Sequence, residues 1–204
     1  MTSDRYRLSF TTGGLFMQEA PMVAERYLAL RDWTQTRAEV RSDNLLQVRT
    51  SAAALRISKE LVARLEHLDQ AELEELTEAS LRDRGYLLWA AACRRNGFIR
   101  DFAVEVLREH YLLRRYQLTF GDYDAFYNGK ALWHAELDEI APSTQHKLRQ
   151  NLFRMLREGD LISDRLQVQH AMPSPRLAQL LARHGTAELL VFPATDSDIQ
   201  RWLK

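Results

Sequence analysis

The sequence predicts a mostly α-helical protein: a helical core with helix-turn-helix-like modules and a small β-wing near the C-terminus, as in a winged helix. Apolar residues recur at helical spacing through most of the chain, and only short runs near the C-terminus carry a strand pattern around a polar turn. The chain has 204 residues, of which 46% are hydrophobic and only 8 are Gly and 5 Pro. This length and composition exclude a disordered chain and allow a core without disulfides.

Residues 1–69 are expected to form an N-terminal helix-turn-helix-like module. Apolar periodicity predicts helices over residues 14–30 and 33–40. A polar turn then leads to a longer helix over residues 51–67, for which Ser51 is the expected N-cap.

Residues 70–118 are expected to form a central apolar helical core. The expected helices cover residues 70–79, 80–95 and 98–116. Leu88 and Trp89 lie in the most apolar stretch, so we expect both side chains to be buried where the flanking modules meet. Replacing a fully buried Leu88 with Ala should destabilise the protein by roughly 2–5 kcal/mol.

Residues 119–204 are expected to form a winged-helix-like module. The expected helices cover residues 122–126, 133–140 and 142–158, one that starts at Ser174-Pro175, and 196–203. Short strands are expected at 161–162 and 166–170, around a turn at residues 163–165, and a further one at 189–192. Three helices followed by a two-stranded hairpin is the element order of a winged helix.

The charge is balanced over the chain but divided into blocks. Lys plus Arg and Asp plus Glu each number 28, which excludes a uniformly basic nucleic-acid-binding protein but not a basic face. Residues 84–118 and 143–183 each hold seven basic and three acidic residues. Solvated helix faces are the more common explanation of such blocks; helices that meet a phosphate backbone are the other.

The helix over residues 143–158 is the stronger candidate for nucleic-acid binding. Its outward face carries basic and amide side chains opposite an apolar stripe, as a recognition helix in the major groove would, and Arg165 lies at the tip of the expected wing. The expected DNA contacts here are Ser143, Thr144, His146, Lys147, Gln150, Arg154, Arg157 and Arg165. A solvated amphipathic surface helix explains the pattern equally well.

The helix that begins at Ser51 is a second, weaker candidate. It follows two short helices, and basic and hydroxyl residues lie at its start and along one face. The expected DNA contacts here are Arg49, Thr50, Ser51, Arg56 and Lys59. A plain helical bundle is at least as good an explanation.

Signals for an enzyme are poor. Gly13-Gly14 lacks the later Gly-Lys-Ser/Thr of a phosphate-binding loop, and His134 with Asp138 has no second ligand pair. Cys93 lies within an apolar helix, as a buried structural thiol does. We therefore expect no catalysis, metal, cofactor or small-molecule substrate.

The sequence favours a cytoplasmic protein without membrane insertion. The longest apolar run, residues 86–93, has eight residues, far fewer than the roughly 20 that span a bilayer. The N-terminus lacks a signal-peptide pattern, and one cysteine cannot form an internal disulfide.

Three segments carry a resemblance to a known family. They read GGLF at residues 13–16, SDNLLQVRTS at 42–51 and KLRQNLFRML at 147–156. With them the chain resembles the BrxA family of BREX (bacteriophage exclusion) systems from about residue 6 to residue 162. The resemblance implies a small, mostly helical, non-catalytic DNA-binding component of a phage-defence locus, whose core has been compared with the antitermination factor NusB.

Three functional hypotheses remain open. The first is a double-stranded DNA-binding accessory protein of a BREX system, with mostly phosphate-directed contacts. The second is an adaptor that docks another BREX subunit, which the zero net charge favours. The third is an RNA-binding factor similar to NusB. The basic cluster on the helix over residues 143–158 favours nucleic acid over the adaptor.

Overall fold

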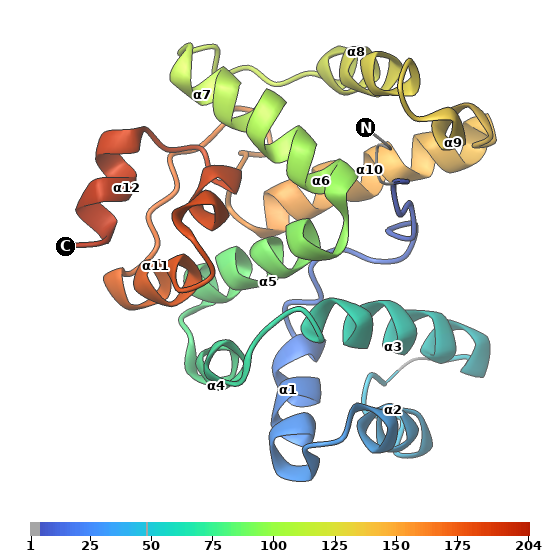
Figure 1. Cartoon of the computed structure of the whole chain (residues 1–204). Helices are drawn as coiled ribbons and strands as arrows, with labels where there is room; N and C mark the ends of the chain where they lie inside the picture. The colour runs from blue at the N-terminus through green and yellow to red at the C-terminus, as the bar shows by residue number, and fades with distance from the viewer. Residues whose placement is uncertain (1–4, 48) are drawn as a thin grey trace.

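The computed structural model describes residues 5–47 and 49–204, and within them the protein is predominantly helical (Figure 1). The elements are α1 (Glu19–Leu30), α2 (Trp33–Ser42), α3 (Ser51–Leu65), α4 (Gln70–Glu78), α5 (Leu81–Arg95), α6 (Gly97–Phe102), the π-helical segment η1 (Ala103–Arg108), α7 (Glu109–Leu112), α8 (Phe120–Ala131), α9 (Ala135–Asp138), α10 (Pro142–Glu158), α11 (Pro175–Ala182), the 3₁₀ helix η2 (Thr186–Val191) and α12 (Asp196–Trp202). The predicted mostly helical class is confirmed.

Helix α5 is the centre of the molecule. Figure 1 shows it between the group α1–α4 and the groups formed by α8–α10 and by α11 and α12, and it contacts α3, α4, α6, α10 and α11. Leu88 is 2% exposed and Trp89 is fully buried, and the Trp89 indole N–H donates to the Val191 carbonyl at 3.0 Å. The expected burial is confirmed. One core cluster extends from Phe10 to Ile199, so the division into three modules stays a prediction.

A Leu88→Ala substitution is expected to lower the free energy of unfolding by about 2–5 kcal/mol. The reason is that the lost methyl groups leave a cavity at the junction of several helices. Urea denaturation followed by circular dichroism measures this loss. A change below about 0.5 kcal/mol would contradict the central position of α5.

The predicted β-wing is wrong. Residues 5–47 and 49–204 contain no strand; the two isolated antiparallel bridges join Ile162 with Val168 and Gln117 with Gln167. The hairpin is too short for a ladder, because Leu166 turns the chain with a φ of 59° and its carbonyl accepts from Leu118 N–H at 2.9 Å. The segment is thus attached to residues 116–118 instead of projecting as a winged-helix hairpin.

The strand expected at residues 189–192 is also wrong, because that stretch belongs largely to η2. An apolar run of four residues does not distinguish a strand from a buried helical turn. The expected helix over residues 98–116 is divided into α6, η1 and α7 and ends at Leu112.

Other differences concern helix ends. The first helix starts at Glu19 and not at residue 14, because Gly13 and Phe16 have φ values of 70° and 62°. Helix α8 is longer than expected, since Thr119 caps it in a capping box in which Asp122 is the reciprocal partner. Among the helices of the described residues, none is both long and apolar enough to cross a membrane.

Candidate nucleic-acid interface

Helix α10 is strongly amphipathic. Pro142 occupies its first turn, where a missing N–H costs nothing, and Gly159 follows its last residue. Its inward side chains pack into the core with exposed fractions of 0–1%: Leu148, Leu152, Phe153, Met155 and Leu156. This confirms the predicted apolar stripe and fixes the rotation of the helix, so the opposite face must point outward.

The outward face of α10 bears the predicted residues. All but one of them are exposed, and Thr144 is half-buried: Ser143, Thr144, His146, Lys147, Gln150, Arg154 and Arg157. Arg165 is exposed in the turn after Ser163. We call the residues on α10 the α10 face. The structure therefore brings together every predicted contact of this helix, whereas Arg165 lies on a turn and not on a wing.

The cations of the α10 face differ in how far they are neutralised. Arg154 Nε donates to Glu158 Oε1 at 2.7 Å, and the arginine side chain is 60% exposed. Lys147 and Arg157 have no acidic partner within 4.0 Å among the residues that the structure describes. The sequence analysis did not anticipate the ion pair with Glu158 at the end of this face. Lys147 and Arg157 therefore carry the uncompensated positive charge of the α10 face.

Glu158 is held in place by the N-terminal segment. Its carboxylate accepts the backbone N–H of Leu15, and a Cβ at Gly14 would collide with it. The Gly14 carbonyl in turn accepts from Arg64 at 2.7 Å. A side chain at Gly14 would therefore displace the Glu158 carboxylate, and Gly13 has a φ of 70° that favours glycine. This pair connects the N-terminal segment with α3 and α10.

Helices α8, α9 and α10 form one group at one end of the molecule (Figure 1). The Arg149 guanidinium donates to both oxygens of Asp124 on α8, at 2.8 and 2.7 Å, and the Tyr127 hydroxyl donates to the Leu137 carbonyl at 2.7 Å. The Gln150 amide contacts the His146 ring at 2.8 Å. Contacts within the group α8–α10 therefore hold the α10 face in a fixed orientation, as a helix that contacts DNA bases requires.

The second candidate surface is smaller than predicted. Thr50, and not Ser51, caps α3, because its hydroxyl accepts the Ala53 N–H at 3.2 Å; the Ser51 side chain lies outside the described residues. Arg49, Arg56 and Lys59 are exposed. Farther along the same helix, Glu60 is 6% and Ala63 is 8% exposed. Only the first half of α3 is open to a ligand.

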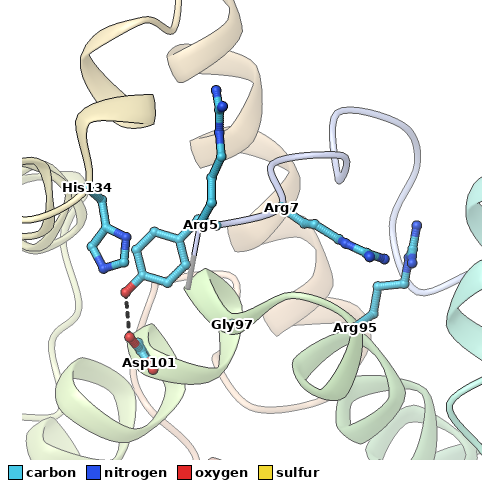
Figure 2. Close-up of a pocket in the computed structure, with 7 residues that line it drawn as sticks. Arg5, Arg7, Arg95, Gly97, Asp101 and His134 are labelled. Carbon is cyan, nitrogen blue, oxygen red and sulfur yellow. Dashed lines mark hydrogen bonds between the residues drawn. The ribbon is translucent and has the colours of Figure 1, made fainter. Parts of the chain in front are cut away.

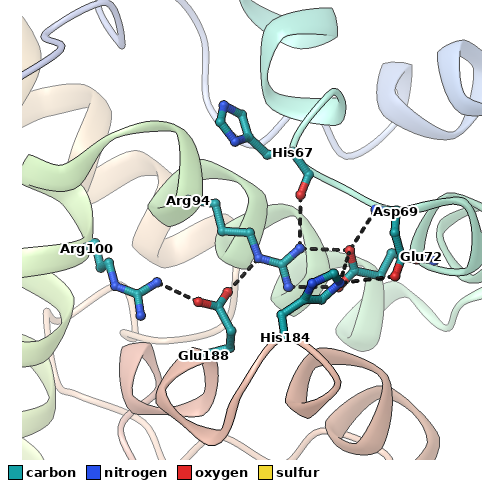
Figure 3. A network of polar contacts seen from close by, with 7 residues as sticks. All are labelled: His67, Asp69, Glu72, Arg94, Arg100, His184 and Glu188. Carbon is teal, nitrogen blue, oxygen red and sulfur yellow. Dashed lines mark hydrogen bonds and ion pairs between the residues drawn. The ribbon is translucent and has the colours of Figure 1, made fainter.

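The described residues contain one group with metal-ligand chemistry, formed by Asp69, Glu72 and His184. Figure 3 shows the Arg94 guanidinium beside the Glu72 carboxylate. Its two terminal nitrogens donate to the two carboxylate oxygens at 2.7 and 2.8 Å. Asp69 also caps α4. A guanidinium in this position supplies the positive charge that a metal ion would supply. These residues act as a structural ion network, which also includes Glu188.

The predicted structural role of Cys93 agrees with its surroundings. The thiol is buried, and burial raises its pKa well above the ordinary value, which suppresses the reactive thiolate. His134 stacks on Tyr6, and its Nδ1 lies 3.1 Å from a Glu136 carboxylate oxygen. The group with metal-ligand geometry among the described residues does not include His134 or Asp138. The absence of catalysis stays a prediction.

The protein is thus a helical protein with one continuous core, and its helix α10, packed with α8 and α9, presents a basic face to the outside. The sequence profile of the BrxA family matches residues 4–185. The chain belongs to the BrxA family, and the resemblance inferred from its sequence segments is confirmed.

Two relatives show how far the similarity extends. The chain is 25% identical over 180 residues to the BREX protein BrxA of Escherichia coli O9:H4 (strain HS), which covers 87% of this chain and 84% of that protein. The crystal structure of an uncharacterized protein from Magnetospirillum magneticum has a TM-score of 0.77 at 21% identity, covering 93% of this chain and 98% of that one. The latter similarity concerns the fold alone.

Proposed function

We propose that this protein is a non-catalytic, double-stranded DNA-binding accessory component of a BREX phage-defence system. The observation that carries the DNA-binding proposal is the α10 face, with two uncompensated cations on one exposed helix surface. The BREX role is supported by membership of the BrxA family and by the name of the E. coli relative.

The geometry of α10 favours duplex DNA over other nucleic acids. An exposed helix fits the major groove of B-DNA, whereas the major groove of duplex RNA is too deep and narrow for side chains to read. No side chain caps the start of α10, and Pro142 has no N–H, while the Thr144 N–H donates to the Ala141 carbonyl at 2.9 Å. The Ser143 N–H and the hydroxyl groups of Ser143 and Thr144 are therefore the candidates for a phosphate contact at this end. Lys147 and Arg157 lie further along the same face, where they would contact phosphates on either side of the helix.

Gln150 is the candidate for a base contact. An amide can bond bidentately with adenine, and the His146 ring at 2.8 Å holds this amide in one orientation. The remaining contacts are directed to phosphates, which position the protein without specifying sequence. We therefore propose weak sequence preference.

The test is binding of the full chain to duplex DNA, duplex RNA and single-stranded DNA of equal length at matched salt. We expect the tightest binding to duplex DNA, and Gln150→Ala should change sequence preference while leaving the salt dependence nearly intact. Equal or tighter binding to duplex RNA would contradict the proposal and favour an RNA-binding function.

A second candidate function is an adaptor for another BREX subunit, favoured by two apolar side chains on the link between α8 and α9. Leu132 is 79% and Trp133 80% exposed, although such residues are usually buried. An exposed tryptophan is a common binding hot spot.

A Trp133→Ala variant tests the adaptor function. We expect this variant to keep the melting temperature of the wild type, because the exposed indole buries little surface against the core. Pull-down of other BREX subunits after nuclease treatment should fall at least tenfold, against Lys204→Ala as the control. Unchanged recovery of every subunit would exclude Trp133 from docking.

A further inference from the structure

A pocket of about 680 Å³ lies between the N-terminal segment and the junction of α5 with α6 (Figure 2). Its charged lining residues are Arg5, Arg7, Arg95 and Asp101. Three guanidinium groups thus share the pocket with one carboxylate. None of these residues belongs to the α10 face, so the pocket is separate from the surface in the proposed function.

The only carboxylate of the lining is already engaged. Asp101 accepts from the Tyr6 hydroxyl and from Lys130 Nζ at 2.9 Å. Arg5 pairs with Glu139 at 2.9 Å, but both side chains are more than 65% exposed, and such pairs contribute little. Asp101 is therefore unable to neutralise the remaining arginines.

Arg7 and Arg95 converge without an acid between them. Figure 2 shows their guanidinium groups directed to the same side of the pocket, and neither has an acidic partner within 4.0 Å in the part of the chain that the structure describes. Arg95 Nε is buried with no hydrogen-bond partner. The α5 C-terminus attracts Arg95 but provides no acceptor for this N–H or for Arg7.

The two arginines also act electrostatically on His67, which is not a lining residue of the pocket. The pKa of His67 lies below its usual value, first because of burial and then because of Arg95 and Arg7. The two guanidinium groups therefore act together on a group on a neighbouring element. A site with this field, unused donors and open volume suits an anion.

We propose that Arg7 and Arg95 form a binding site for a phosphate group. Guanidinium forks match the oxygens of phosphate bidentately, and an anion between them would remove their repulsion and satisfy Arg95 Nε. The phosphate belongs either to the DNA backbone or to a small phosphorylated molecule. The site does not depend on the α10 face.

The first arm of the test measures the melting temperature of the full chain in sodium phosphate and in sodium chloride at equal ionic strength. At ten times its Kd, phosphate should raise the melting temperature by about 3 °C. Arg7→Gln and Arg95→Gln should lose this shift, and Arg82→Gln, an exposed arginine on α5, should keep it. A general salting effect of phosphate would appear equally in all four proteins, and that result would overturn the proposal.

The second arm measures duplex DNA binding by the same proteins. Weaker binding by both Gln variants with a smaller salt slope assigns the site to the DNA backbone. Phosphate-specific stabilisation with unchanged DNA binding assigns it to a small phosphorylated ligand. No difference from the wild type in either arm overturns the site. Arg7 is exposed, so Arg7→Gln decides the outcome if Arg95→Gln does not fold.

Discussion

Replacing Arg94 with alanine is expected to lower the free energy of unfolding by about 3–5 kcal/mol. Arg94 donates to Glu72 at 2.7 and 2.8 Å and to Glu188 at 2.5 Å, which connects α5 with α4 and η2 (Figure 3). Glu72 is fully buried, so loss of the guanidinium removes two charge-assisted hydrogen bonds and leaves its carboxylate with the Asp69 N–H at 2.9 Å and the His184 ring at 3.6 Å. Urea denaturation of the wild type and the variant measures the effect.

The matched control is Arg82→Ala on the same helix. Arg82 pairs with Asp160 at 3.7 Å, and both side chains are more than half exposed, so this change should cost less than about 1 kcal/mol. An Arg94→Met, Glu72→Gln double variant should be more stable than Arg94→Met alone, because the double variant has no unpaired carboxylate at position 72. A cost below about 1 kcal/mol for Arg94→Ala would contradict the structural role of the network.

The same network predicts a pH dependence. Burial tends to raise the pKa of Glu188, but hydrogen bonds from Arg94 and Arg100 outweigh it and leave the pKa below its usual value. A carboxylate with a lowered pKa stabilises the fold above the pKa of the unfolded chain, about 4.3 for Glu, and this contribution is lost as the pH falls. The difference in stability between the wild type and Arg94→Ala should therefore shrink below about pH 4.3.

Reversing both uncompensated charges of the α10 face has the largest effect expected on function. Lys147→Glu with Arg157→Glu should weaken duplex DNA binding by about 100-fold, or about 2.7 kcal/mol, because two attractive contacts become repulsive. Stability should change by less than about 0.5 kcal/mol for each exposed site. The charge-matched control is Arg82→Glu with Arg183→Glu, since both arginines are exposed.

If the double reversal and its control bind DNA equally well, α10 is not the interface. The open first half of α3, with Arg49, Arg56 and Lys59, would then be the remaining candidate of the sequence analysis. Loss of binding together with unfolding would instead give these side chains a structural role.

The helical class and the core could be predicted from the sequence, because apolar periodicity reports burial directly. Leu88, Trp89 and the stripe of α10 are buried as expected. The β-wing could not be judged in this way. Whether the segment around Leu166 forms a ladder depends on its contacts with residues 116–118, which lie far away in the sequence.

The outward face of α10 was likewise predictable from helical spacing, but its ion pairs were not. The Glu158 carboxylate accepts from the Leu15 N–H as well as from Arg154, and Leu15 lies 143 positions away in the sequence. The Arg94 network and the convergence of Arg7 and Arg95 also join distant segments, and no local spacing identifies them.

The most direct test of the DNA-binding account is the slope of log K against log salt for duplex DNA. Each phosphate contact contributes about −0.9 to this slope. Lys147→Ala and Arg157→Ala should each reduce its magnitude by about 0.9, whereas Arg154→Ala should reduce it less, because Glu158 already pairs with Arg154 at 2.7 Å. An affinity and a slope unchanged from the wild type in both Lys147→Ala and Arg157→Ala would contradict the account.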